Sequence, residues 1–290
     1  MVKIFLLFSL LLELTLFAKP NIVVSILPQK TFVDKIAQGL VEVTVMVPPG
    51  SSPHNYEPKV SQMIALSKSD IYFSIGIEFE RVWLARFKSQ NPELNFIDMS
   101  RGIKKIASLH HHHDHEDDKS HKEDEHHEEE QSDPHTWTAP SNVKIMAQTI
   151  FETLIKLDPK NASSYEQNLH NFLKEITQTD TAIQTVLKPL KPKTAFMVFH
   201  PSWGYFAKEY NLEQIAVEVE GKSPKPKEII AIIKEAKDEN VQVIFTQPEF
   251  SDKSAKVIAQ ESKIAVKKIS PLNPKWSQNL IFMAESIAKK

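Results

Sequence analysis

The stretch that decides the fold is ASSYEQNLHNFLKEITQTDTAIQTVL, residues 162–187, which contains neither glycine nor proline. Its apolar side chains recur at helical spacing. They are Leu169, Phe172, Leu173, Ile176, Ile183 and Leu187. At ~1.5 Å per residue such a helix would span roughly 40 Å. Pro189 and Pro192 follow it, so the sequence predicts one long, stiff helix that ends before them.

On both sides of this helix, short β-branched runs alternate with helical patterns. Before it, we expect strands at 21–26, 41–47, 71–75 and 95–98 and helices at 28–40, 59–68, 79–88 and 141–157. After it, we expect strands at 194–199, 214–219, 241–246 and 265–269 and helices up to 210 and at 227–239, 251–262 and 277–288. The predicted fold class is therefore α/β, with two lobes that each hold a parallel β-sheet flanked by helices, joined by one long rigid helix.

The start of the chain has the features of a secretory signal peptide, residues 1–18. Lys3 gives the positive region, residues 4–17 the apolar core, and Ala18 precedes an expected cleavage at Lys19. The apolar run is too short for a membrane span, which takes about 20 residues. Because the sequence holds no cysteine, we expect no lipid-anchored cysteine, disulfide scaffold or thiolate ligand. The expected location is the periplasm.

The expected domain order after the signal is a first lobe at 19–135, linking helices at 136–192 and a second lobe at 193–290. The first lobe includes the histidine-rich segment, residues 110–133, with eight His, eleven Asp or Glu and no apolar side chain. Such a segment cannot offset its ordering entropy by burial, so we expect a solvated, mobile loop. Imidazole and carboxylate groups together attract divalent cations, above all zinc. A charged linker or the remnant of a tag is the weaker alternative, because the segment is internal and rich in histidine.

The charge balance gives little reason to expect nucleic acid as a partner. The whole chain has a formal net charge of −2, while the histidine-rich segment alone holds eleven acids and two lysines. The remainder is therefore mildly basic, without clustered arginine. We expect a monomer.

Three histidines lie where a parallel α/β sheet binds its ligands. His54 and His200 follow expected strands, and His135 follows the histidine-rich segment. Ligands of open sheets bind outside the carboxyl ends of the strands. A lone loop histidine, such as His170 on the long helix, is more often exposed or hydrogen-bonded than a ligand. The three share proline-rich or strand-end contexts, so we predict a nitrogen-rich site between the lobes, which suits Zn²⁺ better than Mn²⁺.

Three motifs carry a family resemblance: SPHNYEP at 52–58, DPHTW at 133–137 and HPSWGYF at 200–206. They resemble the signatures of the cluster A-I solute-binding proteins, the zinc- and manganese-binding components of ABC importers, ZnuA-type in particular. The resemblance covers nearly the whole chain after the signal. It implies two lobes bridged by one helix, metal between them and handover to a membrane permease. It also implies that zinc members carry His at position 200, where manganese members tend to have Glu.

The chain departs from the family pattern at two positions. Ser52 stands where many members have Asp, and Ser270 stands where an Asp usually supplies a fourth ligand. A neutral hydroxyl is a poor zinc ligand, and we expect Ser270 to begin a turn. The prediction is three histidines plus water or an anion, with Glu249 or a side chain of the histidine-rich segment as possible help.

Other side chains near the expected ligands have supporting roles. Trp137 and Trp203 lie beside the expected ligands and Trp276 lies near the C-terminal loop, and we expect them to pack the lobe edges and exclude water. Glu57 would either orient His54 through a hydrogen bond or cap the surface.

The resemblance and the three histidines together predict a function. We expect a protein that captures Zn²⁺ as transported ligand in the periplasm and delivers it to an ABC transporter permease, without enzyme activity. The alternatives are manganese or another divalent metal, a secreted zinc hydrolase, or a zinc buffer or adhesin without a transporter. The hydrolase is disfavoured because the sequence lacks a His-Glu-x-x-His motif.

Overall fold

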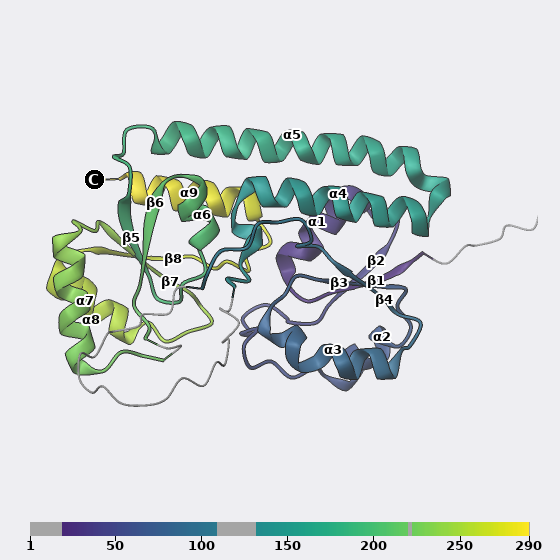
Figure 1. The fold of residues 1–290 in the computed structure, drawn as a ribbon, viewed down its shortest axis with the longest axis horizontal. Helices are drawn as coiled ribbons and strands as arrows, with labels where there is room; N and C mark the ends of the chain where they lie inside the picture. The colour runs from purple at the N-terminus through teal and green to yellow at the C-terminus, as the bar shows by residue number, and fades with distance from the viewer. Residues whose placement is uncertain (1–18, 109–131, 220–221, 290) are drawn as a thin grey trace, which may run out of the picture.

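The computed structural model describes residues 19–108, 132–219 and 222–289 (Figure 1). The expected signal peptide and nearly all of the histidine-rich segment lie outside these residues. Within the described ranges, no helix has both the length and the apolar character needed to cross a membrane.

The first lobe is built on a parallel four-stranded sheet in the order β2-β1-β3-β4. Its strands are β1 (Asn21–Val24), β2 (Glu42–Val45), β3 (Ile71–Ser74) and β4 (Asn95–Asp98). Its helices are α1 (Leu27–Ala37), α2 (Val60–Leu66), α3 (Glu78–Gln90) and α4 (Pro140–Leu157). Figure 1 shows α2 and α3 on one face of the sheet and α1 and α4 on the other. Both faces are covered, so the central strands can be apolar throughout.

The second lobe repeats this topology with the order β6-β5-β7-β8, again parallel. Its strands are β5 (Thr194–Val198), β6 (Leu212–Ala216), β7 (Val243–Thr246) and β8 (Ala265–Lys268). Its helices are α6 (Gly204–Glu209), α7 (Pro226–Asp238), α8 (Lys253–Ser262) and α9 (Trp276–Ala288). The strand expected at 214–219 lies at Leu212–Ala216 instead. The apolar alternation continues past Ala216, where the N–H groups of Val217 and Glu218 still donate to the carbonyls of Val198 and Phe199.

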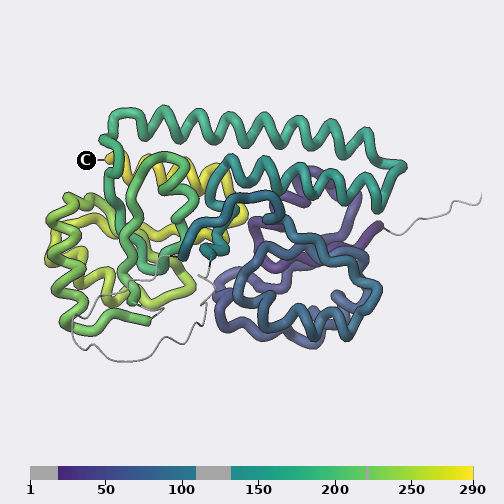
Figure 2. Tube along the Cα trace, viewed as in Figure 1, coloured from purple at the N-terminus to yellow at the C-terminus, as the bar shows by residue number. Residues whose placement is uncertain are grey.

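The long helix α5 (Ala162–Leu187) has 26 residues and the bounds that the sequence predicted. It runs along both lobes (Figure 2) and packs against α1, α4 and α9. Its buried face repeats every three or four residues, from Tyr165 to Leu187. The short 3₁₀ turns η1 (Thr136–Thr138) and η2 (Pro159–Asn161) flank α4. The predicted fold class is confirmed.

The C-terminal helix α9 ties the second lobe to this helical layer. The ring of Trp276 packs edge-on against Phe32 of α1, with centroids 5.7 Å apart. Leu280 and Met283 belong to the same buried cluster as the first-lobe strands, whereas a second cluster is confined to β5–β7, α7 and α8. The lobes are therefore joined by α9 as well as by α5. The predicted domain boundary at residue 193 remains a prediction.

Candidate metal centre

A cavity of about 450 Å³ lies between the lobes and receives residues from both of them. His54 reaches it from the proline-rich loop after β2, His135 from the segment before η1, and His200 from the end of β5. The structure thus places all three predicted ligands on the wall of one cavity.

The rings of His54 and His200 approach each other directly. Their Nε2 atoms are 3.2 Å apart and their planes are inclined by 76°. Two nitrogens bound to one tetrahedral Zn²⁺ at ~2.0–2.1 Å lie roughly 3.3–3.4 Å apart. The observed separation therefore suits two nitrogens that share one cation.

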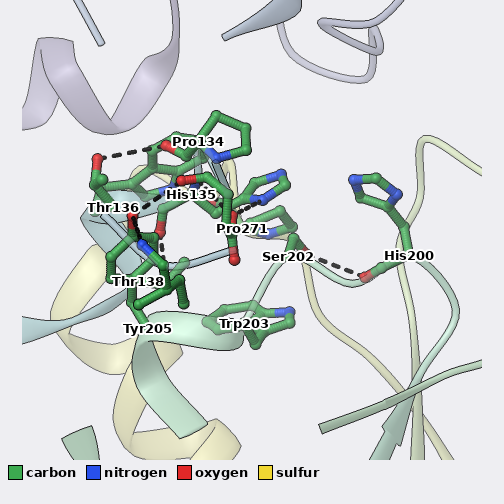
Figure 3. A network of polar contacts seen from close by, with 12 residues as sticks. Pro134, His135, Thr136, Thr138, His200, Ser202, Trp203, Tyr205 and Pro271 are labelled. Atoms are coloured by element: carbon green, nitrogen blue, oxygen red, sulfur yellow. Dashed lines mark hydrogen bonds and ion pairs between the residues drawn. The ribbon is translucent and has the colours of Figure 1, made fainter. Parts of the chain in front are cut away.

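The ring of His135 is close to this pair. Its centroid lies 5.3 Å from that of His200 and the two ring planes are inclined by 74°; Figure 3 shows the two rings near each other. Among the described residues, no three His, Cys, Asp or Glu side chains already stand at the mutual distances of a bound metal. The structure therefore brings the Nε2 atoms of two predicted ligands together and places the ring of the third beside them.

Each of the three rings is paired with a carboxylate through Nδ1. The pairs are His54–Glu78 at 2.9 Å, His135–Asp133 at 2.7 Å and His200–Glu218 at 2.8 Å. A carboxylate that accepts from Nδ1–H fixes the orientation of the ring and the tautomer in which Nε2 carries the lone pair. This is the arrangement that metal-binding histidines usually have.

Sequence reasoning did not assign these carboxylates. For His54 it considered Glu57, which is exposed, whereas the partner is Glu78 in the first turn of α3. Asp133 belongs to a quoted motif, and its position two residues before His135 was an available signal. Glu218 lies just beyond β6, at the same sheet edge as His200, but only the correct strand end reveals this.

The backbone of His200 is held by Gln247, the residue after β7. The Gln247 amide accepts from the His200 N–H at 3.2 Å and donates to the His200 carbonyl at 2.7 Å. Phe250, from the same turn, stacks on the His200 ring at 4.9 Å with an interplanar angle of 23°. The turn after β7 therefore fixes both the main chain and the ring of this histidine.

The tryptophans pack as expected. Trp137, Trp203 and Trp276 are all buried. The indole of Trp137 donates to the Pro271 carbonyl, and the indole of Trp276 donates to the Trp137 carbonyl, both at 2.8 Å. These two bonds connect the His135 segment to the cavity wall at residues 271–272 and to α9.

The start of α6 holds the Asp133 segment. Tyr205 donates to the Asp133 carbonyl at 3.0 Å and accepts from the Ile106 N–H at 3.3 Å. Burial raises the pKa of Tyr205 to about 12, so its hydroxyl stays protonated near neutral pH. A Cβ atom on Gly204 would lie 2.6 Å from Asp133 Oδ2, so this close approach requires glycine.

Ser270 occupies the place of the expected fourth ligand, but its hydroxyl is already engaged. It donates to Glu249 Oε1 at 2.7 Å and accepts from the Leu272 N–H at 3.1 Å. The Ser270 carbonyl accepts from the Asn273 N–H, which confirms the predicted turn. Glu249, and not Ser270, lines the cavity.

A family model described as "Zinc-uptake complex component A periplasmic", ZnuA, matches residues 22–289. The chain belongs to the ZnuA family. A crystal structure of ZnuA superposes with a TM-score of 0.83 at 40% identity, covering 93% of this chain and 98% of that one. The match therefore includes both lobes and the long helix.

Curated relatives of this family bind more than one metal, judging by their names. The high-affinity zinc uptake protein ZnuA of Bacillus subtilis is 28% identical over 84% of this chain and 75% of its own. The manganese ABC transporter substrate-binding lipoprotein ScaA of Streptococcus gordonii is 25% identical over 80% of this chain and 73% of its own. The chain is thus a metal-binding, substrate-binding protein of the ABC transporter type, and membership alone does not choose between zinc and manganese.

Proposed function

We propose that this protein captures Zn²⁺ in the periplasm through His54, His135 and His200 and delivers it to the permease of an ABC transporter. The observation that carries the proposal is the set of three imidazoles on one cavity wall, each bonded at Nδ1 to a carboxylate. This pairing leaves the Nε2 atom of each ring to bind a cation.

The choice of zinc over manganese rests on the donor atoms. Three imidazole nitrogens favour Zn²⁺, because first-row affinities at nitrogen sites rise steeply from Mn²⁺ towards Cu²⁺ and remain high at Zn²⁺. A manganese site is expected to offer more oxygen. In competition, Zn²⁺ should displace Mn²⁺ from this site.

Binding and release follow from the chemistry of the site. The neutral rings bind the cation, the paired carboxylates offset its charge, and a small relative movement brings the three rings together. Because α5 and α9 both join the lobes, we expect a small rocking of the lobes instead of a wide hinge motion. Protonation of the rings in acid should release the metal.

We propose binding without catalysis. The three carboxylates paired with the rings accept hydrogen bonds from Nδ1 and so orient the ligands instead of acting as a general base. Turnover of ester or peptide substrates that a chelator abolishes and zinc restores would instead support a hydrolase.

The test is metal analysis of the protein purified without chelator or metal-affinity column, followed by titration with Zn²⁺ and Mn²⁺. We expect one tight zinc site and a higher Tm in saturating zinc, because the metal binds the folded state. If His54→Ala, His135→Ala and His200→Ala all leave the tight site unchanged, the assignment is wrong.

A further inference from the structure

The turn after β7, residues 247–250, brings one more carboxylate to the cavity. Its first residue, Gln247, bonds to the His200 backbone. Its last residue, Phe250, stacks on His200 and lies 6.2 Å from the His54 ring. Glu249 lies between these two anchors and lines the same cavity as the three histidines. Its position is therefore set by residues that contact the predicted ligands.

The hydroxyl of Ser270 holds one oxygen of this carboxylate and leaves the other free. It donates to Oε1 of Glu249, while the Leu272 N–H donates to the hydroxyl and fixes its direction. Oε2 of Glu249 accepts no hydrogen bond or ion pair from the residues that the structure describes. Glu249 is half-buried, and a cation bound in the cavity would give its second carboxylate oxygen a partner.

We propose that Glu249 is the oxygen ligand that completes the coordination of the captured cation, and that Ser270 is the positioning residue that orients it. This proposal rests on the three-histidine site proposed above. Zn²⁺ accepts a carboxylate oxygen at ~2.0–2.2 Å alongside imidazole nitrogen in a tetrahedral shell. In this proposal Glu249, which follows β7, takes the role of the Asp expected at position 270 after β8. Ser270, which stands at that position, donates a hydrogen bond to Glu249.

The test compares Glu249→Gln and Ser270→Ala with the wild-type chain, using Zn²⁺ in competition with a chromophoric chelator. The control is Glu261→Gln, which neutralises an exposed carboxylate on α8 of the same lobe. We expect Glu249→Gln to weaken zinc binding by about 10–100-fold, Ser270→Ala to weaken it less, and the control to bind as wild type.

A second readout reports the coordination shell itself. Co²⁺ bound in place of Zn²⁺ has a visible spectrum that depends on the number and type of its ligands. We expect the spectrum to change in Glu249→Gln and to be retained in Glu261→Gln. If Glu249→Gln matches wild type in both affinity and Co²⁺ spectrum while His200→Ala loses zinc, this proposal is overturned and the three-histidine site stands. If His200→Ala also keeps its zinc, the proposed function itself fails.

Discussion

The two sides of the metal centre differ in how firmly they hold their ligands. The side chains of His135 and His200 are 10% and 13% exposed, and those of their carboxylate partners 5% and 6%. On the other side, the side chains of His54 and Glu78 are 35% and 46% exposed. A hydrogen bond to a charged group is stronger where water is excluded. His135 and His200 are therefore oriented before the metal arrives, whereas His54 lies on a solvated loop and is expected to close the site.

This comparison predicts that the buried ligands contribute more to affinity than the exposed one. Replacing His200 by Ala should reduce zinc affinity by more than ~100-fold. Removing a ligand is expected to cost more than removing the hydrogen-bond partner of a ligand, which typically costs ~10–100-fold. Replacing His54 by Ala should cost less, since water can take its place. Competition titration measures both, and His170→Ala on the exposed face of α5 is the control. An equal or larger loss in His54→Ala would remove the distinction.

The carboxylate partners should also differ between the buried and the exposed side, with smaller losses of zinc affinity than the histidines. Glu218→Gln replaces the charged acceptor of a buried ring by a neutral amide oxygen and should reduce zinc affinity by about 10–100-fold. Glu78→Gln should reduce it by less than ~10-fold, because exposed pairs are screened by water. The two variants are isosteric and serve as controls for each other. Equal losses would show that exposure does not set the strength of these pairs.

A substitution at Gly204 should disturb the buried side of the metal centre without removing a ligand or its carboxylate partner. Gly204→Ala introduces a Cβ that would lie 2.6 Å from Asp133 Oδ2, so it should displace the partner of His135. We expect a several-fold loss of zinc affinity and a loss of stability of about 1–3 kcal/mol. Lys208→Ala, at an exposed position on the same helix, is the control. Wild-type affinity in Gly204→Ala would show that the Asp133 position does not matter.

The smallest effect on zinc binding is expected from Glu80, a buried carboxylate on the first-lobe side. Glu80 accepts from Ser25 and from the Ile75 and Gly76 backbone, and burial raises its pKa from 4.5 to about 7. The folded state therefore binds this proton more tightly than the unfolded state, and stability is lost as pH rises from 4.5 to 7. The loss is at most about 3 kcal/mol.

Glu80→Gln should remove this pH dependence from the metal-free protein. Denaturant unfolding of both chains between pH 4.5 and 7 measures it. Parallel stability curves would contradict the raised pKa.

Elements whose bounds depend on local sequence were predicted correctly, whereas elements whose bounds depend on contacts with distant residues were not. The bounds of α5 and β4 were predicted because local periodicity and flanking prolines determine them. The bounds of β6 were missed because the alternating apolar residues Ile215, Val217 and Val219 continue past its last residue, Ala216. Local periodicity does not report where the regular pairing of a strand begins and ends.

The site shows the same limit. His54, His135 and His200 could be predicted, because strand ends and proline-rich loops mark them in the sequence. Two of their carboxylate partners are harder to predict, because they lie far away in the sequence. Glu78 lies 24 residues from His54, and Glu218 lies 18 residues from His200. Only the packing of the strands brings these side chains together. The bond between Ser270 and Glu249 is likewise made between two strand ends.

The central claim is that three imidazoles share one cation between the lobes, and anomalous scattering at the zinc edge from crystals of the zinc-loaded protein tests it most directly. We predict one strong peak in the cavity, at ~2.0–2.1 Å from Nε2 of His54, His135 and His200. A cavity without such a peak, or a zinc ion bound to none of the three rings, would contradict the account.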